Sequence, residues 1–180
     1  MSATPLLRLV LQAMQKQGLE AVLIGNAGAA IHGAPVTTID FDFMFRDTAT
    51  NLRKLKAMAR ELKATVLSPY YPVSKLYRMV DDDLGLQVDL MSVVDGVRSF
   101  EGLRSRATRT TLENTPLLVA SLADIVASKK AASRPRDLAV MEVLERTLHA
   151  QEKASQARKT PTDAATSARR AQGRKRSPSH

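Results

Sequence analysis

Several residue types that build common functional sites are scarce or missing in this sequence. It contains no cysteine, which excludes a disulfide framework and a thiolate metal site. Its three histidines, His32, His149 and His180, have no partner histidine at a metal-ligand spacing, so we expect no zinc site. The chain also lacks a membrane-spanning apolar run and the basic-then-apolar layout of a secretion signal. We therefore expect a soluble, cytoplasmic protein.

Positive charge is in excess and unevenly placed. The formal net charge is +9, and residues 151–180 contain eight Lys and Arg but only two acidic residues. This segment is rich in Ala, Ser, Thr and Gln, with almost no large apolar residue, which predicts a disordered basic tail after a domain at 1–150. Such an arm can bind tRNA or another nucleic acid electrostatically. A merely solvated tail remains the alternative.

Residues 22–45 are the stretch around which the rest is organised. An apolar run ends at Gly25-Asn26, and residues 27–31 follow as a short predicted helix. Residues 39–45 alternate as Ile-Asp-Phe-Asp-Phe-Met-Phe, which predicts a strand with Asp40 and Asp42 on one face and the phenylalanines on the other.

The spacing of these residues suggests a metal and phosphate site. Carboxylates two apart on a strand can converge on Mg²⁺, which one or two carboxylates and substrate phosphates usually hold. The turn at Gly25 and Asn26 leads into a helix N-terminus that favours a phosphate, with Asn26 as the expected N-cap. The alternative is a half-exposed strand whose polar face happens to be acidic, and Asp-x-Asp alone matches often by accident.

A third carboxylate lies on a later predicted strand. Residues 84–94 alternate so that Gln87, Asp89 and Met91 share one face. This strand is expected to form a hairpin with residues 75–80 around an acidic turn. If it neighbours the strand at 39–45, Asp89 joins Asp40 and Asp42.

The combination resembles the nucleotidyltransferase superfamily, with its polymerase-β-like fold. Closest are small stand-alone members related to abortive-infection and toxin–antitoxin nucleotidyltransferases. The resemblance covers about residues 5–150, including a Ser121-capped helix with Lys129 and a helix from near Pro135 to about Ala150. It implies an α/β fold: a short mixed sheet of residues 22–24, 39–45 and 84–94, flanking helices and a C-terminal helical cap.

The resemblance also implies an activity, the Mg²⁺-dependent transfer of an NMP from an NTP such as ATP to a hydroxyl of tRNA, protein or a small molecule. Two Mg²⁺ ions are expected, with Asp89 nearer the acceptor, and Asp137 either orients Lys129 or caps its helix. A toxin or antitoxin protein is an expected partner. The expected catalytic and metal residues are Asp40, Asp42 and Asp89, and the expected nucleotide-binding residues are Gly25, Asn26, Lys129, Arg134 and Arg136.

Two positions depart from the family pattern. Asn26 replaces the usual Gly or Ser, and Val36 stands where many relatives carry an Arg. Together with the basic tail, these departures favour an alternative function, a catalytically silent antitoxin or nucleic-acid-binding protein. The three acidic residues favour the enzyme.

Overall fold

The computed structural model describes residues 3–38, 40–68 and 75–172, so the expected strand residue Ile39 lies outside it. The chain divides into two compact units, Met1–Leu144 and Glu145–His180. The first contains the whole sheet and all candidate site residues. No helix in the described part is long and apolar enough to cross a membrane.

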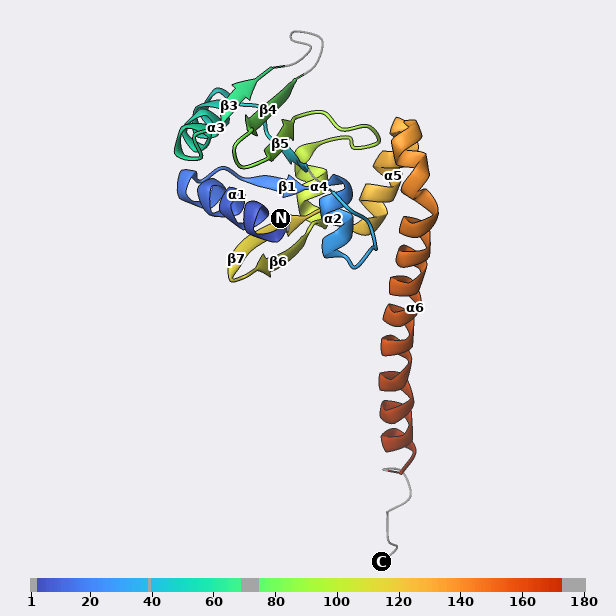
Figure 1. Cartoon of the computed structure of the whole chain (residues 1–180). Helices are drawn as coiled ribbons and strands as arrows, with labels where there is room; N and C mark the ends of the chain where they lie inside the picture. Colours follow the sequence, from blue (N-terminus) through green and yellow to red (C-terminus); the bar gives the residue numbers. More distant parts are fainter. Residues whose placement is uncertain (1–2, 39, 69–74, 173–180) are drawn as a thin grey trace, which may run out of the picture. The chain divides into compact units, whose positions relative to one another are not determined.

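One mixed sheet of seven strands forms the centre of the first unit (Figure 1). Its order is β3-β4-β5-β2-β1-β7-β6, in which β2–β5 and β1–β7 are parallel and the other neighbours antiparallel. This confirms the expected α/β fold with a mixed sheet, and the expected hairpin between residues 75–80 and the strand that bears Asp89 is part of it. The strands are β1 (Ala21–Leu23), β2 (Phe41–Phe45), β3 (Thr65–Leu67), β4 (Leu76–Asp81), β5 (Leu86–Met91), β6 (Thr108–Leu112) and β7 (Thr115–Val119).

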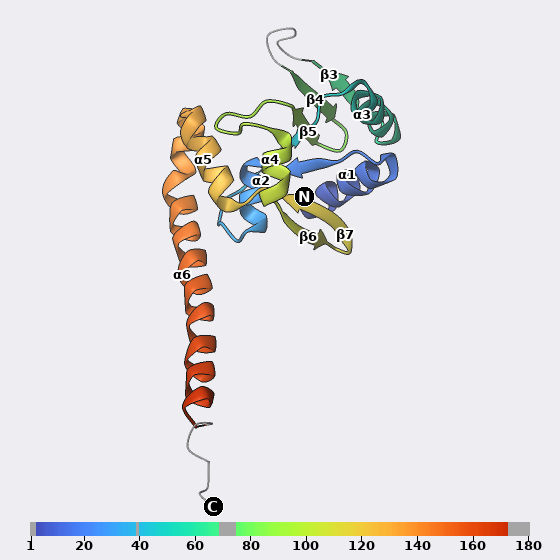
Figure 2. The same ribbon diagram turned by 180° about the vertical axis from the view of Figure 1, so that it is seen from behind.

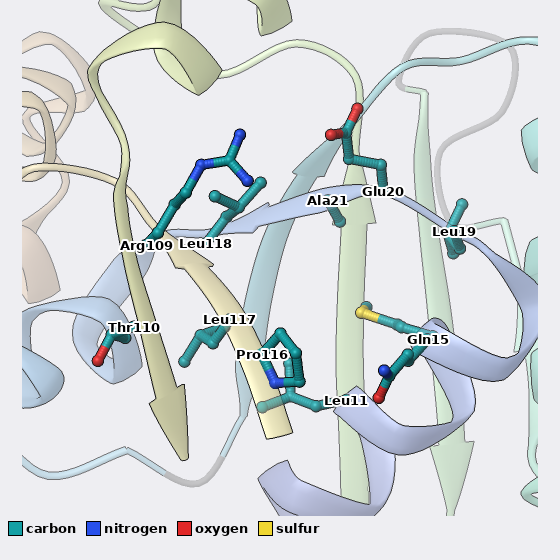
Figure 3. A pocket seen from close by; sticks show the side chains of 11 residues that line it. Leu11, Gln15, Leu19, Glu20, Ala21, Arg109, Thr110, Pro116, Leu117 and Leu118 are labelled. Carbon is teal, nitrogen blue, oxygen red and sulfur yellow. The ribbon is translucent and has the colours of Figure 1, made fainter. Parts of the chain in front are cut away.

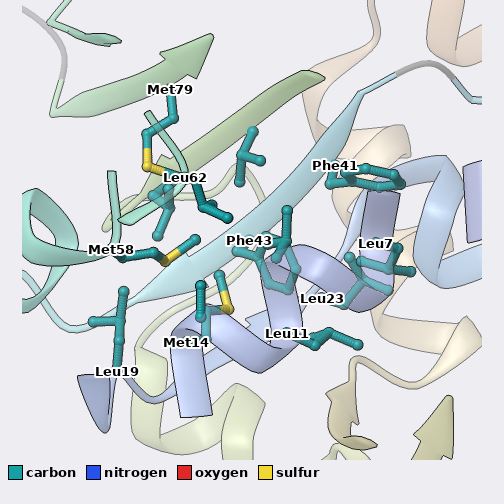
Figure 4. Packing of buried hydrophobic residues seen from close by; sticks show 14 of the residues in the cluster. Leu7, Leu11, Met14, Leu19, Leu23, Phe41, Phe43, Met58, Leu62 and Met79 are labelled. Carbon is teal, nitrogen blue, oxygen red and sulfur yellow. The ribbon is translucent and has the colours of Figure 1, made fainter. Parts of the chain in front are cut away.

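The main core lies on the face of the sheet that carries the phenylalanines. Helices α1 (Ala3–Gln17) and α3 (Ala49–Glu61) pack their apolar residues against it (Figure 4). Phe43 pairs in register with Leu23 of β1 and Leu90 of β5, so the three side chains share this face. All three are fully buried, which fixes the register of the central strands because a one-residue slip would expose them.

Three shorter helices complete the first unit: α2 (Gly25–Ile31), α4 (Phe100–Arg106) and α5 (Leu122–Ala132) (Figures 1 and 2). Gly28 of α2 allows a close approach, since a Cβ there would lie 3.0 Å from Ile125 Cδ1 of α5 and 3.3 Å from the Leu23 carbonyl oxygen. Ser121 caps α5 as expected, because its hydroxyl accepts the Asp124 N–H.

The start of α2 differs from the expectation. The prediction that Asn26 is its N-cap is wrong, because Asn26 lies inside the helix and the preceding Ile24 makes no side-chain cap. The Gly28 N–H already donates to the Ile24 carbonyl oxygen at 3.1 Å, so helical hydrogen bonding begins before Asn26. Gly25 turns the chain with a φ of +64°, a conformation in which glycine is favoured.

Both acid-bearing strands are shorter than expected. Asp40 lies in a bend before β2, where the Thr38 hydroxyl donates to its carbonyl oxygen at 2.6 Å. Such a local bond competes with strand pairing. Strand β5 excludes Leu84, which is 42% exposed in the turn before it. It also ends before Val94, which bridges to Val97 instead.

The last helix, α6 (Pro135–Gln172), continues well past the predicted end near Ala150. That prediction is wrong because Ala, Gln, Glu, Lys and Arg favour a helix even without a core to pack on. In this helix Leu138 is 57% exposed, whereas Met141 and Leu144 are buried. The buried stripe of this helix therefore begins at Asp137 and leaves Leu138 beside it. The expected division between a domain at 1–150 and a disordered tail at 151–180 stays a prediction.

Candidate functional site

Three carboxylates converge on the face of β2 opposite the phenylalanines. Each of Asp40, Asp42 and Asp89 offers an oxygen atom, and these atoms lie within 4.8 Å of one another. The parallel pairing of β2 and β5 places Asp42 beside Asp89 in register. Asp40 precedes Asp42 by two residues, and its carboxylate accepts a hydrogen bond from the Thr38 hydroxyl at 3.1 Å. We refer to these three residues as the acidic cluster.

Asp42 has a strongly shifted pKa. Burial raises its pKa to about 6, and the neighbouring charges of Asp40 and Asp89 add to the rise. The positive charges of Lys129 and Arg136 act in the opposite direction on the same pKa. Asp42 is thus crowded by negative charge that the nearby basic residues only partly offset.

Gly25 makes room for this carboxylate. A Cβ built at Gly25 would overlap the Oδ2 atom of Asp42, and the positive φ disfavours any other residue. The adjacent Ile24 N–H donates to the Asp42 carbonyl oxygen at 2.9 Å. The turn after β1 therefore holds the backbone directly against the acidic cluster.

Arg78 of β4 is a member of the site that sequence reasoning missed. It pairs in register with Asp89, and its Nε and Nη2 atoms donate to Asp89 Oδ1 at 2.7 Å and Oδ2 at 2.6 Å. The signal for this contact was the hairpin between β4 and β5. Once its turn is set at residues 82–85, antiparallel pairing brings Arg78 opposite Asp89.

Lys129 and Asp137 form a buried ion pair at the junction of α5 and α6. The Lys129 ammonium donates to Asp137 Oδ1 at 2.8 Å, and the two side chains are only 11% and 9% exposed. Of the two roles expected for Asp137, this contact favours orienting Lys129. Because Lys129 lowers the pKa of Asp42, its charge acts directly on the acidic cluster.

The remaining expected nucleotide ligands are placed differently. Arg136 acts on Asp42 electrostatically, whereas Arg134 donates to Asp95 at 2.9 Å. The amide nitrogen of Asn26 donates weakly, at 3.5 Å, to the Thr37 carbonyl oxygen. Its Oδ1 atom is buried and has no hydrogen-bond partner among the described residues. A nucleotide-binding role for these residues stays a prediction.

A groove of about 340 Å³ lies away from this chemistry, beside α1 and the β6–β7 hairpin (Figure 3). Its walls are mainly apolar, and Glu20 at its rim is held by Arg104 at 2.6 Å. No member of the acidic cluster lines it. The lining residues are Leu11, Met14, Gln15, Leu19, Glu20, Ala21, Arg109, Thr110, Pro116, Leu117 and Leu118.

Comparisons with known proteins support the fold. No family model matches the chain, and no curated protein is similar enough in sequence to count as a match. A solution structure of the antibiotic-resistance factor ANT(2'')-Ia is similar, with a TM-score of 0.58 and 11% identity over 91% of this chain and 96% of that one. A crystal structure of ANT(2'')-Ia with adenylyl-2''-tobramycin has a TM-score of 0.60 and 14% identity, over 84% and 92%.

These similarities confirm the nucleotidyltransferase fold expected from the resemblance. At this level of identity they concern the fold alone. Neither comparison supports a relation to toxin–antitoxin proteins.

Proposed function

We propose that this protein is a Mg²⁺-dependent nucleotidyltransferase that moves an NMP from an NTP to a hydroxyl acceptor. The observation that carries the proposal is the convergence of Asp40, Asp42 and Asp89 on one face of a sheet with the nucleotidyltransferase fold. Three carboxylates on neighbouring strands are an unfavourable arrangement unless a cation offsets their charge.

The acidic cluster fits a hard divalent cation. It offers only carboxylate oxygens, the donor type that Mg²⁺ prefers. Burial and the charges of Asp40 and Asp89 raise the pKa of Asp42 although Lys129 and Arg136 act to lower it. Asp40, Asp42 and Asp89 would hold the ion, and Gly25 has no Cβ that would collide with the Asp42 carboxylate.

In the proposed reaction the acceptor oxygen attacks the α-phosphorus of the NTP. A new P–O bond forms, the bond to the β-phosphate oxygen breaks, and pyrophosphate leaves. The acceptor proton passes to a carboxylate oxygen, for which Asp89 is the candidate. Bound Mg²⁺ supplies Lewis-acid stabilisation of the charge that develops on the phosphate oxygens.

The basic residues close to Asp42 suit the triphosphate. Lys129 is fixed by Asp137, so its ammonium is pre-oriented at little further entropic cost. Arg136 brings a second positive charge to the same carboxylate. Gly25 and Asn26 would approach the phosphates through backbone N–H groups and the Asn26 amide, while Arg134 must leave Asp95 to take part.

The net charge of the chain indicates which class of acceptor it would bind. The ANT(2'')-Ia crystal structure is a complex with adenylyl-2''-tobramycin. This chain has a net charge of +9, which attracts anions and repels polycations. Residues 151–180 contain eight Lys and Arg and two acidic residues, so they carry most of this charge. They are the candidate contact for an anionic acceptor such as tRNA. The toxin–antitoxin setting expected from the sequence stays a prediction.

A catalytically silent binding protein is the second candidate. The observation in its favour is that Arg78 already occupies both oxygens of Asp89. A carboxylate that remained in this ion pair would be removed from metal binding and from proton transfer.

Labelled NTP and Mg²⁺, incubated with the protein, total RNA and a small-molecule extract, test the proposal. We expect label to enter one acceptor fraction, and Asp42→Asn to lower the rate by at least about 100-fold, since a bound metal is worth several kcal/mol in the transition state. The matched control is Asp83→Asn, which removes an exposed turn carboxylate and should keep full activity. Transfer that persists in Asp42→Asn would contradict the proposed site.

A further inference from the structure

Arg78 belongs to a row of charged residues that crosses three neighbouring strands. The register places Asp42 of β2 beside Asp89 of β5, and Asp89 beside Arg78 of β4. The three side chains therefore project from the same face of the sheet. Asp89 stands in the middle of the row, with carboxylates on one side and a guanidinium on the other.

The carboxylates at this site differ in whether a basic side chain pairs with them. Asp89 is 5% exposed, and Arg78 satisfies both of its oxygens through two short parallel hydrogen bonds. Among the described residues, no basic side chain forms an ion pair with Asp40 or Asp42. A buried carboxylate needs a positive partner, and Arg78 provides one for Asp89 alone.

We propose that Arg78 competes with the divalent cation for Asp89. In the metal-free protein Arg78 holds the third carboxylate, and the cation gains it only when this ion pair loosens. The proposal rests on the function proposed above, because it concerns the same acidic cluster. It assigns Arg78 as a positioning residue that acts through Asp89.

The competition follows from the contacts. A guanidinium that binds both oxygens of a carboxylate occupies one lone pair on each, so a cation cannot bind that carboxylate through the same two lone pairs. A divalent ion shared with Asp40 and Asp42 would also stand close to the Arg78 charge, and like charges at short range in a half-buried site repel. Such coupling is reciprocal, so weakening the ion pair must tighten the binding of the cation.

The geometry also separates the two proposed tasks of Asp89. While Arg78 donates to both oxygens, the guanidinium occupies one lone pair on each, which limits how a cation or an acceptor proton can reach Asp89. Release of Arg78 makes Asp89 available for metal binding and for proton transfer at once. The ion pair thus couples cation binding to the availability of Asp89 for proton transfer.

Titration of the full-length protein with Mn²⁺ tests this inference without measuring activity. Free Mn²⁺ is followed by electron paramagnetic resonance. We expect Arg78→Gln to bind Mn²⁺ about tenfold more tightly than the native chain. Arg78→Lys, which keeps the positive charge, should recover most of the native affinity. Arg104→Gln removes an arginine from an exposed ion pair with Glu20, and should leave Mn²⁺ binding unchanged.

The Asp89→Asn background provides the second arm. Because Arg78 acts mainly through Asp89, Arg78→Gln should tighten Mn²⁺ binding much less in that background, where only the direct repulsion between Arg78 and the cation is removed. This double variant also avoids leaving a buried carboxylate unpaired. Unchanged or weaker binding in the Arg78→Gln single variant, or an equal gain in both backgrounds, would overturn the inference. If native and Arg78→Gln proteins both bind no Mn²⁺, the proposed function fails with it. If only the variant binds, the competition is confirmed.

Discussion

The two faces of β2 make opposite contributions to the stability of the fold. On one face, Phe41, Phe43 and Phe45 are at most 2% exposed and pack into the main core. On the other, Asp42 is crowded by two further carboxylates and has a pKa raised to about 6. The first face stabilises the fold, and the second lowers its stability at neutral pH. A strand with a period of two can do both because neighbouring side chains point in opposite directions.

The largest effect is expected on the apolar face. Phe43→Ala removes a fully buried ring and should lower the free energy of unfolding by about 3–5 kcal/mol, as measured by urea denaturation. The matched control is Met44→Leu on the opposite face, where Met44 is also buried. This nearly volume-conserving change should cost less than about 1.5 kcal/mol. Equal losses in both variants would show that the loss in Phe43→Ala does not come from removal of the buried ring.

On the acidic face, the substitution Asp42→Asn is expected to raise the free energy of unfolding. A pKa raised from 3.8 to about 6 means that folded Asp42 holds its proton more tightly than unfolded Asp42. The protonated Asp42 therefore adds to the free energy of unfolding. This contribution is complete below about pH 4 and is lost as the pH rises through about 6. At pH 8 without metal, Asp42→Asn should therefore raise the free energy of unfolding by up to about 3 kcal/mol.

The pH dependence of this gain distinguishes charge crowding from other causes. Urea denaturation at pH 8 and at pH 3.5 should show the gain at the higher pH and little difference at the lower one. Asp83→Asn, in an exposed turn, serves as the control at both. A destabilised Asp42→Asn protein at pH 8 would indicate that this carboxylate has a structural role.

The smallest effect on stability is expected from removal of residues 151–180, which belong to neither face of β2. Residues 152–157 are exposed, so a chain ending at Ala150 should unfold within about 1 kcal/mol of the full-length protein. RNA binding, if it depends on the basic residues of 151–180, should fall steeply with salt in the full chain and be lost on truncation. A large drop in the midpoint of thermal unfolding would mean that the segment packs against folded structure.

The sequence was sufficient for the parts of the site that follow from strand periodicity. Alternation placed Asp42 opposite the phenylalanines, and the structure brings Asp40, Asp42 and Asp89 together as expected. The acidic pattern and the Gly25 turn also led to the nucleotidyltransferase fold, which the structural similarities confirm. Alternation within one strand is local, so a single sequence records it. The meeting of Asp89 with Asp40 and Asp42 is a long-range contact, and its prediction depended on the two strands being neighbours, as the family resemblance implies.

Features that depend on register or on precise helix ends were harder to predict. The Arg78–Asp89 ion pair required the turn of the β4–β5 hairpin to be fixed to the residue. Asn26 is a favourable N-cap residue in isolation, but the Gly25 turn starts α2 before it. After Ala150, α6 stays helical through intrinsic helix propensity without burial. The prediction missed this because it took the scarcity of apolar residues as a sign of disorder.

The parallel pairing of β2 with β5 has a consequence for how the protein is made. Asp42 and Asp89 are distant in sequence, and the hairpin partner of β5, β4, lies between them in the chain. Contacts of high sequence separation form late, because closing the intervening loop costs entropy before the contact is gained. A nascent chain that has emerged from the ribosome only as far as β2 has Asp40 and Asp42 but not the third carboxylate. The acidic cluster is therefore complete only once β5 has been synthesised and docked, so unfinished chains do not carry the assembled site.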